Sequence, residues 1–192
     1  MKFSLKQKNK GFTLIETLVA ISIFTVSVIA LLTIVSSGIT DTLYAKKKMA
    51  AIYLAQEGIE YMRNMRDTYL LYPPNGTVGW DDFKVKIEDC NTDNGKGCYF
   101  NDQALDFNDQ IQPIIDITIS PCVAGVCPTL LYDSLTGKYN YTTGVNSGFV
   151  RRINITNINA HETQIYSTVT FMNGSVPYEI TFSENLFNWI RQ

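Results

Sequence analysis

The sequence predicts an α+β protein in which one long N-terminal helix precedes an antiparallel β-sheet. No proline occurs between Met1 and Tyr72, and the first part of this stretch is strongly apolar. After Pro73 the sequence changes to short runs of alternating apolar and polar residues between turn residues, a pattern typical of antiparallel strands. We therefore expect a helix over the first third of the chain and a β-rich head over the rest.

Composition and charge place the chain among folded proteins with a marked asymmetry. Its 192 residues are 45% hydrophobic and 18% charged, with a net charge of −2, which is unlike a disordered chain. Residues 1–11 hold four lysines and no acid, so the remaining residues carry a net charge of −6. Because this body is acidic, we predict no electrostatically driven nucleic-acid partner.

The apolar segment that follows the basic leader is long enough to cross a membrane. Residues 12–35 include 17 apolar side chains among 24, and a helix of that length spans roughly 36 Å. The apolar region of a secretory signal peptide is shorter, about 7–15 residues. Glu16 is the only ionisable residue in 12–40. Since a carboxylate inside a spanning helix costs about 2.5–3.5 kcal/mol, Glu16 is a candidate functional residue.

The residues around Gly11 resemble the leader and N-methylation motif of type IV pilins and type II secretion pseudopilins. The resemblance rests on Lys10-Gly11-Phe12-Thr13-Leu14-Ile15-Glu16 followed by Thr17-Leu18-Val19-Ala20. It implies cleavage after Gly11 and N-methylation of Phe12 by a prepilin peptidase. It also implies that Glu16 pairs with the N-terminal amine of Phe12 in a neighbouring subunit, so that head-to-tail stacking builds a filament.

The resemblance implies a division of the chain, a location and a set of partners. Residues 1–11 are the leader that is removed, 12–40 the transmembrane and assembly helix, 41–72 its amphipathic continuation and 73–192 the head. The partners are the prepilin peptidase/N-methyltransferase, other pilins or pseudopilins in a helical filament, an inner-membrane assembly platform and membrane lipid. The protein is expected in the membrane before assembly, with its leader cytoplasmic and its head external, and afterwards in a surface or periplasmic filament.

Beyond the membrane segment the helical pattern becomes amphipathic. Apolar side chains recur at spacings of three and four, which predicts packing against a sheet; they are Ile52, Ala55, Ile59, Met62, Met65 and Tyr69. Gly58 lies within this stretch, which favours a close approach of another element. We expect the helix to bend or melt near Ser36-Ser37 and Gly38, and to end before Pro73-Pro74-Asn75-Gly76.

Two further stretches resemble the minor-pilin or minor-pseudopilin branch of the same family. One is Ala50–Glu60, which contains Leu-Ala-Gln-Glu-Gly-Ile-Glu, continued by Arg63-Asn64-Met65-Arg66-Asp67. The other is the chain end, Phe182–Trp189. They imply a minor rather than a major subunit.

The head is predicted to contain five or six strands. The alternating runs are 83–88, 115–119, 149–156, 165–171 and 176–182. Asn173-Gly174 between the last two predicts a hairpin, and Pro177 is expected near the end or edge of its strand. Residues 89–112 and 133–148, rich in Asn, Asp and Gly, are expected to be loops.

All four cysteines lie in the head, and three pairings are possible. External location favours oxidation, and we favour the local pairs Cys90–Cys98 and Cys122–Cys127. The alternatives are free buried thiols or a zinc site, for which only the spacing of Cys122 and Cys127 comes near.

No catalytic pattern is found, so the sequence predicts neither an enzyme nor a cofactor or metal site. His161 is the only histidine, and no nucleophile-elbow, zinc-protease, P-loop or dinucleotide motif occurs. The main alternative to a filament subunit is a membrane-anchored surface binding or adhesion protein that does not polymerise. A membrane-tethered enzyme ranks third.

Overall fold

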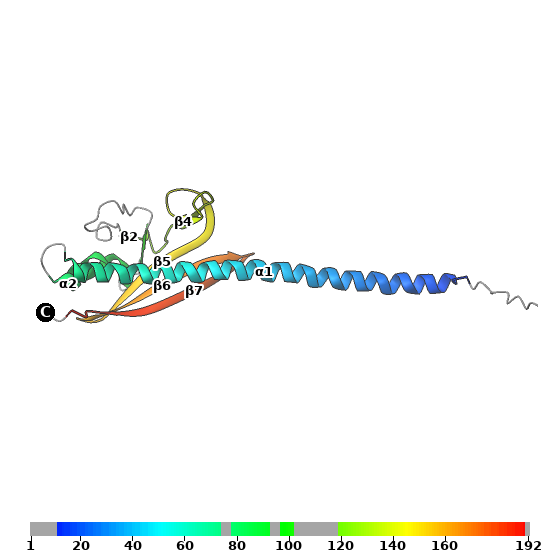
Figure 1. The fold of residues 1–192 in the computed structure, drawn as a ribbon, viewed down its shortest axis with the longest axis horizontal. Coiled ribbons are helices and arrows are strands. Elements are labelled where there is room, and N and C mark those ends of the chain that lie inside the picture. The colour runs from blue at the N-terminus through cyan, green and yellow to red at the C-terminus, as the bar shows by residue number, and fades with distance from the viewer. Residues whose placement is uncertain (1–10, 74–77, 93–96, 102–118, 191–192) are drawn as a thin grey trace, which may run out of the picture. The chain divides into compact units, whose positions relative to one another are not determined.

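The computed structural model has the predicted α+β architecture, with one long helix followed by an antiparallel sheet of seven strands (Figure 1). It describes residues 11–73, 78–92, 97–101 and 119–190. These residues form two compact units, the first ending at Ala45 and the second beginning at Lys46.

Helix α1 extends from Leu14 to Leu71 as a single α-helix. It is helical through Ser36-Ser37 and Gly38, so the predicted local melting at these residues is wrong. The predicted end before Pro73 is confirmed, since the helix ends at Leu71. The physical reason is that Pro73 lacks an N–H and disfavours helical geometry in the residue before it. The same helix contributes an exposed apolar half to the first unit and a packing face to the second.

Residues 83–88, predicted as a strand, lie instead in a short helix and the turn after it. Helix α2 covers Gly79–Lys86 and is followed by the 3₁₀ turn Glu88–Cys90. Trp80, Phe83 and Ile87 are buried, and their spacing of three and four is that of a helix. Burying these three large side chains in a helix stabilises the segment more than a strand would, although the helix leaves Val85 exposed.

The second unit contains the sheet. Its strands are β1 (Cys98–Phe100), β2 (Ile119–Pro121), β3 (Thr129–Asp133), β4 (Lys138–Asn140), β5 (Val145–Asn159), β6 (Glu162–Asn173) and β7 (Val176–Phe187). All pairings are antiparallel. Strand β5 is central, because β6 and then β7 lie on one side of it while β1–β2 and β3–β4 share its other side.

The predicted hairpin between the last two runs is confirmed as β6–β7. Asn173 pairs with Val176, so the turn consists of Gly174 and Ser175. Gly174 has φ of +61°, a conformation that a two-residue hairpin loop requires and that glycine adopts without strain. Pro177 is the second residue of the edge strand β7, as predicted, where its missing N–H removes little from the sheet.

The expected loops contain more regular structure than predicted. Strand β1 lies within 89–112, and both β4 and the beginning of β5 lie within 133–148. These strands are too short for an alternating pattern to stand out, and their pairing with neighbouring strands stabilises them. Of the strand predicted at 115–119, only Ile119 lies within the described residues, where it begins β2.

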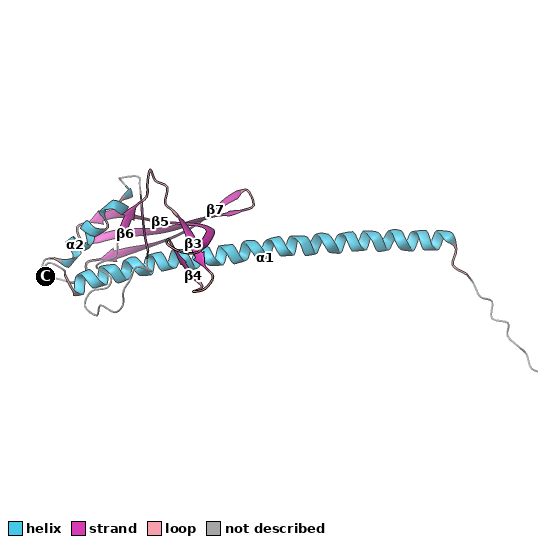
Figure 2. Cartoon of the chain, turned by 90° about the horizontal axis from the view of Figure 1, so that it is seen from above, coloured by secondary structure: helices cyan, strands magenta, loops and turns pink. Residues whose placement is uncertain are grey.

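The core lies between α1 and one face of the sheet (Figure 2). From α1 it takes Ala55, Ile59, Met62, Met65 and Tyr69, as predicted, together with Ala51, Leu54, Gly58 and Leu70. Ile52 is only half-buried, because the packing face is turned toward Ala51 and Leu54. The odd-numbered residues of β5 and β6 face this helix, among them Ile153, Ile155, Ile165 and Val169.

Candidate functional site

The described chain begins with the predicted processing residues, which precede α1. Gly11, Phe12 and Thr13 have no regular secondary structure. The Phe12 side chain is 85% exposed, and every residue from Gly11 to Leu43 is exposed. A continuous apolar surface of this length requires a nonaqueous partner, either lipid or other apolar helices.

Glu16 and Thr13 form a reciprocal cap at the first turn of α1. The Thr13 N–H and the Thr13 hydroxyl both donate to Glu16 Oε2, each at 2.9 Å. The Glu16 N–H donates in return to Thr13 Oγ1 at 3.4 Å. Thr-x-x-Glu before an apolar helix is the sequence pattern of this capping box, so the local sequence alone could have predicted the cap, although it was not predicted above.

Eight hydroxyl groups of this part of α1 are satisfied within the helix. Each donates to a main-chain carbonyl three or four residues earlier, and they belong to Thr17, Ser22, Thr25, Ser27, Thr33, Ser37, Thr40 and Thr42. Such bonding removes the cost of placing a hydroxyl in a medium without water. Helix α1 is also the one helix among the described residues that is long and apolar enough to cross a membrane.

All four cysteines are oxidised. Cys90 pairs with Cys98 across a Cα–Cα distance of 4.8 Å, and Cys122 pairs with Cys127 across 4.5 Å. These are the two local pairs favoured from the sequence. Each disulfide closes a short loop of the head, and with both sulfur pairs bonded these thiols are not available as zinc ligands.

His161 lies in the turn between β5 and β6 and is exposed. Its main chain closes the end of the sheet, since its N–H donates to Asn159 Oδ1 at 2.8 Å and its carbonyl accepts from the Asn188 N–H at 2.9 Å. Among the described residues no group of three or more His, Cys, Asp and Glu side chains is placed to hold a metal ion.

The head contains a buried charge that was not predicted from the sequence. Arg151 is 2% exposed, and its Nη1 donates to Glu57 Oε2 of α1 at 2.8 Å. Its guanidinium carbon lies 4.3 Å from the ring centroid of Phe100. Burial raises the pKa of the adjacent Tyr141, and the positive charge of Arg151 opposes this increase. The alternation of the strand could have predicted this burial, because Arg151 lies two residues before Ile153 and four before Ile155 and so points to the same, inward face of the sheet.

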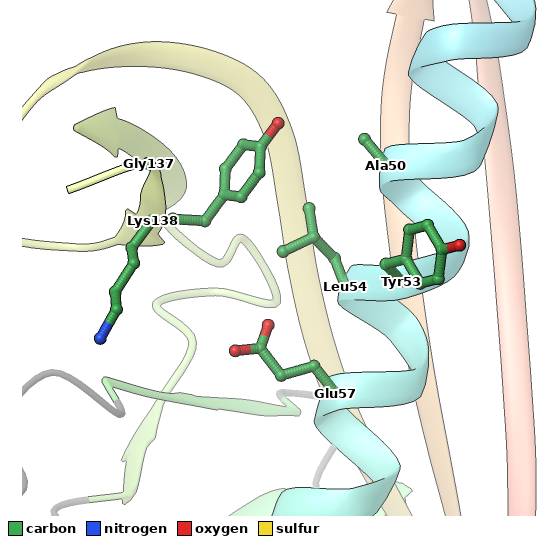
Figure 3. A pocket seen from close by; sticks show the side chains of 7 residues that line it. Ala50, Tyr53, Leu54, Glu57, Gly137 and Lys138 are labelled. Carbon is green, nitrogen blue, oxygen red and sulfur yellow. The ribbon is translucent and has the colours of Figure 1, made fainter. Parts of the chain in front are cut away.

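A shallow groove lies between α1 and the β3–β4 turn (Figure 3). It has a volume of about 480 Å³, and its lining residues are Ala50, Tyr53, Leu54, Glu57, Gly137, Lys138 and Tyr139. Glu57 and Leu54 point from the helix toward the hairpin in Figure 3. The Glu57 carboxylate that lines the groove also forms the ion pair with Arg151. The position of this lining residue therefore depends on the packing of the sheet on α1.

Comparison with known proteins supports the interpretation of the N-terminal segment. A family profile described as the prokaryotic N-terminal methylation motif matches residues 6–32. This range contains Gly11, Phe12 and Glu16 and most of the apolar segment. Searches among curated proteins and solved structures returned no match.

The motif and the fold agree with the architecture expected from the sequence. The chain combines a prepilin-type N-terminal motif, an apolar helix long enough to cross a membrane and an α+β head. The matched motif supports a protein of the type IV pilin and pseudopilin type. The motif suggests a structural rather than an enzymatic role.

Proposed function

We propose that this protein is a structural subunit of a type IV pilus or a type II secretion-like filament, of the minor-pilin or minor-pseudopilin branch, and not an enzyme. The observation that carries the proposal is the first turn of α1, where Glu16 lies within the matched motif and at the start of an apolar helix whose residues Leu14–Leu43 are all exposed among the described residues. The minor-subunit branch rests on the resemblance of residues 50–67 and 182–189.

In this proposal the chain is made as a prepilin and processed before assembly. Prepilin peptidase removes residues 1–11 after Gly11 and methylates the new amino group of Phe12. Residues 12–40 then hold the protein in the membrane until an inner-membrane platform transfers it into a filament. There the same segment packs against equivalent helices, and the head, residues 73–192, faces outward.

Glu16 can serve the cap and an intersubunit ion pair at the same time. Both contacts from Thr13 go to Oε2, and no described residue donates to Oε1 of the same carboxylate. A neighbour's Phe12 amine could therefore be bound at Oε1 without loss of the cap. Two opposite charges that are costly separately in an apolar assembly compensate one another as a pair.

Two substitutions separate these roles of Glu16. Glu16→Gln keeps an oxygen that accepts from the Thr13 N–H but removes the charge, whereas Thr13→Ala removes the capping hydroxyl and keeps the charge. We expect both variants to be processed. Glu16→Gln should be depleted from sheared filaments, and Thr13→Ala should be incorporated, at a cost of about 1 kcal/mol in helix stability.

The measurement is the ratio of protein in the sheared filament fraction to protein in the membrane, in cells that express each variant. Normal incorporation of Glu16→Gln together with loss of Thr13→Ala would show that Glu16 acts through the cap alone. If the unmodified protein is processed but never enters a filament, the alternative of an anchored surface protein is correct.

A further inference from the structure

The end of the head that follows the membrane segment along the chain has three lysines. Lys46, Lys47 and Lys48 are the first residues of the second unit, and all three are exposed. They follow Thr40, the last residue of the apolar segment, by six to eight positions, or roughly 9–12 Å along a helix. The polar layer of a bilayer is about 5–8 Å thick on each side, so long lysine side chains at this distance reach lipid phosphates.

The β6–β7 turn lies beside these lysines. Lys47 Nζ donates to the main-chain carbonyl of Met172 at 2.9 Å, and the turn projects beyond the neighbouring strands (Figure 2). Around this contact the exposed fractions are 59% for Met49, 49% for Met172 and 53% for Val176. Because consecutive residues of a helix point about 100° apart, Lys46, Lys47, Lys48 and Met49 encircle α1 rather than share one face, and Lys47 joins them to the turn residues Met172–Val176; we call this ring of lysines and the turn beside it the lysine–hairpin patch.

The segments that form this patch contain cations and no acidic residue. No carboxylate occurs in residues 42–56 of α1 or in residues 163–178 of the hairpin. Exposed single apolar residues are ordinary on a protein surface, but here Met49 directly follows the three lysines along the chain and Met172 accepts a hydrogen bond from one of them. Lysines around a few exposed apolar side chains match the chemistry of an anionic membrane surface, where the amines meet phosphates and the apolar groups enter the interface.

Aromatic residues support the base of the patch. Phe171 and Tyr178, the third pair from the turn, stack with centroids 5.7 Å apart, and Phe149 and Tyr139 continue the row at 5.8 Å steps. Tyrosines near the membrane surface also have a physical place there, because their rings are apolar and their hydroxyls polar.

From these contacts we infer that, before assembly, the head docks on the surface of its own membrane through the lysine–hairpin patch, and that the lipids it binds are anionic. The inference rests on the membrane anchoring of the chain and not on its incorporation into a filament. Docking fixes the head against the bilayer, and transfer into a filament then requires its release from the lipid surface.

The test uses the full chain reconstituted in lipid nanodiscs, with one chain per disc. The discs contain phosphatidylcholine either alone or mixed with phosphatidylglycerol. An environment-sensitive fluorophore is attached at Ser175→Cys in the turn, or at His161→Cys at the other end of β6 as a control. The four native cysteines are in disulfides, so only the introduced thiol reacts. We expect a blue-shifted emission at position 175 with phosphatidylglycerol only, and no change at position 161.

Two matched triple substitutions test the cause. Lys46→Gln/Lys47→Gln/Lys48→Gln should lower the ratio of docked to free head by about two orders of magnitude, at about fivefold for each lysine. Lys84→Gln/Lys86→Gln/Lys138→Gln removes the same charge elsewhere on the head and should leave the ratio unchanged. Salt near 1 M, where the Debye length is about 3 Å, should abolish the response.

Several outcomes would overturn the inference. Equal emission in the two lipid compositions, or an equal loss with both triple substitutions, would exclude specific docking on anionic lipid. A response that grows with the number of chains per disc, and not with lipid charge, would identify a second copy as the partner. None of these outcomes changes the filament measurements on Glu16, so failure here and failure of the proposed function are distinguishable.

Discussion

At the scale of single residues, two charged side chains are stabilised in different ways. Glu16 lies in an apolar segment and has its partner in its own first turn, Thr13. Arg151 lies inside the head and has its partner on another element, Glu57 of α1. The cap forms whenever the helix forms, whereas the Arg151 ion pair requires the sheet to pack on the helix.

The Arg151–Glu57 pair predicts unequal effects of removing its two members. Glu57→Ala leaves a buried guanidinium without its carboxylate and should destabilise the head by about 2 kcal/mol. This is below the roughly 3–5 kcal/mol of a fully buried pair, because Glu57 is 40% exposed and water can replace part of the contact. Arg151→Met keeps the packing of the side-chain stem and frees Glu57 to water, so it should cost less.

Urea unfolding of the full chain in detergent measures both effects through tryptophan fluorescence, since Trp80 is buried in the head. The opposite order, with Arg151→Met the more damaging, would mean that the contact of Arg151 with Phe100 matters more than the ion pair.

At the scale of elements, the close approach of α1 to the sheet depends on Gly58. A Cβ at this position would overlap Ser167 Oγ and lie 3.0 Å from Ile153 Cδ1. Both neighbours are fully buried and have little room to move. The glycine that weakens the helix is thus what allows β5 and β6 to pack on it, as predicted from its place in the amphipathic stretch.

Gly58→Ala should therefore destabilise the head although alanine is the better helix former. We expect a net loss of up to about 2 kcal/mol, because overpacking costs about 1–3 kcal/mol and helix propensity returns about 1 kcal/mol. Gly38→Ala is the matched control, since a Cβ there would have no neighbour within 4 Å. It should leave urea unfolding of the head unchanged. Equal behaviour of the two variants would contradict tight packing at Gly58.

At the scale of the whole molecule, the two units are built for different solvents. The first is a helix with its apolar side chains exposed and with eight of its hydroxyls bonded to its own main chain, which suits lipid or a bundle of similar helices. The second encloses a core and is closed by two disulfides, which suits an oxidising aqueous compartment.

The intact mass of the protein from its own membrane tests this organisation as a whole. We expect a chain from Phe12 to Gln192 that carries one added methyl group and lacks four hydrogens, in agreement with leader removal and two disulfides. Fragment masses should place the methyl group on Phe12 and the hydrogen deficit on peptides that contain the cysteines. A chain that keeps Met1 to Gly11 after export would contradict processing.

Much of the fold could be predicted because its signals are local. The beginning and end of α1 follow from an apolar run and Pro73, and the β6–β7 hairpin follows from alternation around Gly174. Helix α2 was not predicted because residues 83–88 alternate between apolar and polar side chains, as a strand does. Its helical conformation is selected by tertiary packing, including the contact of Phe83 with Tyr69. Strands β1 and β4 have three residues each, too few for any period to be read.

By itself, the sequence determined the apolar N-terminal segment of the protein and the extent of α1. The leader, the apolar segment, the position of Glu16 and its capping pattern are all properties of neighbouring residues, and a helix satisfies its main-chain hydrogen bonds within one segment. Only the tertiary structure decided the arrangement of the head: Arg151 against Glu57, Gly58 against Ser167, and Lys47 against the turn at Met172. Each of these contacts joins residues about a hundred positions apart. No local pattern specifies such a pair, because it forms only when a sheet with the correct register packs on the helix.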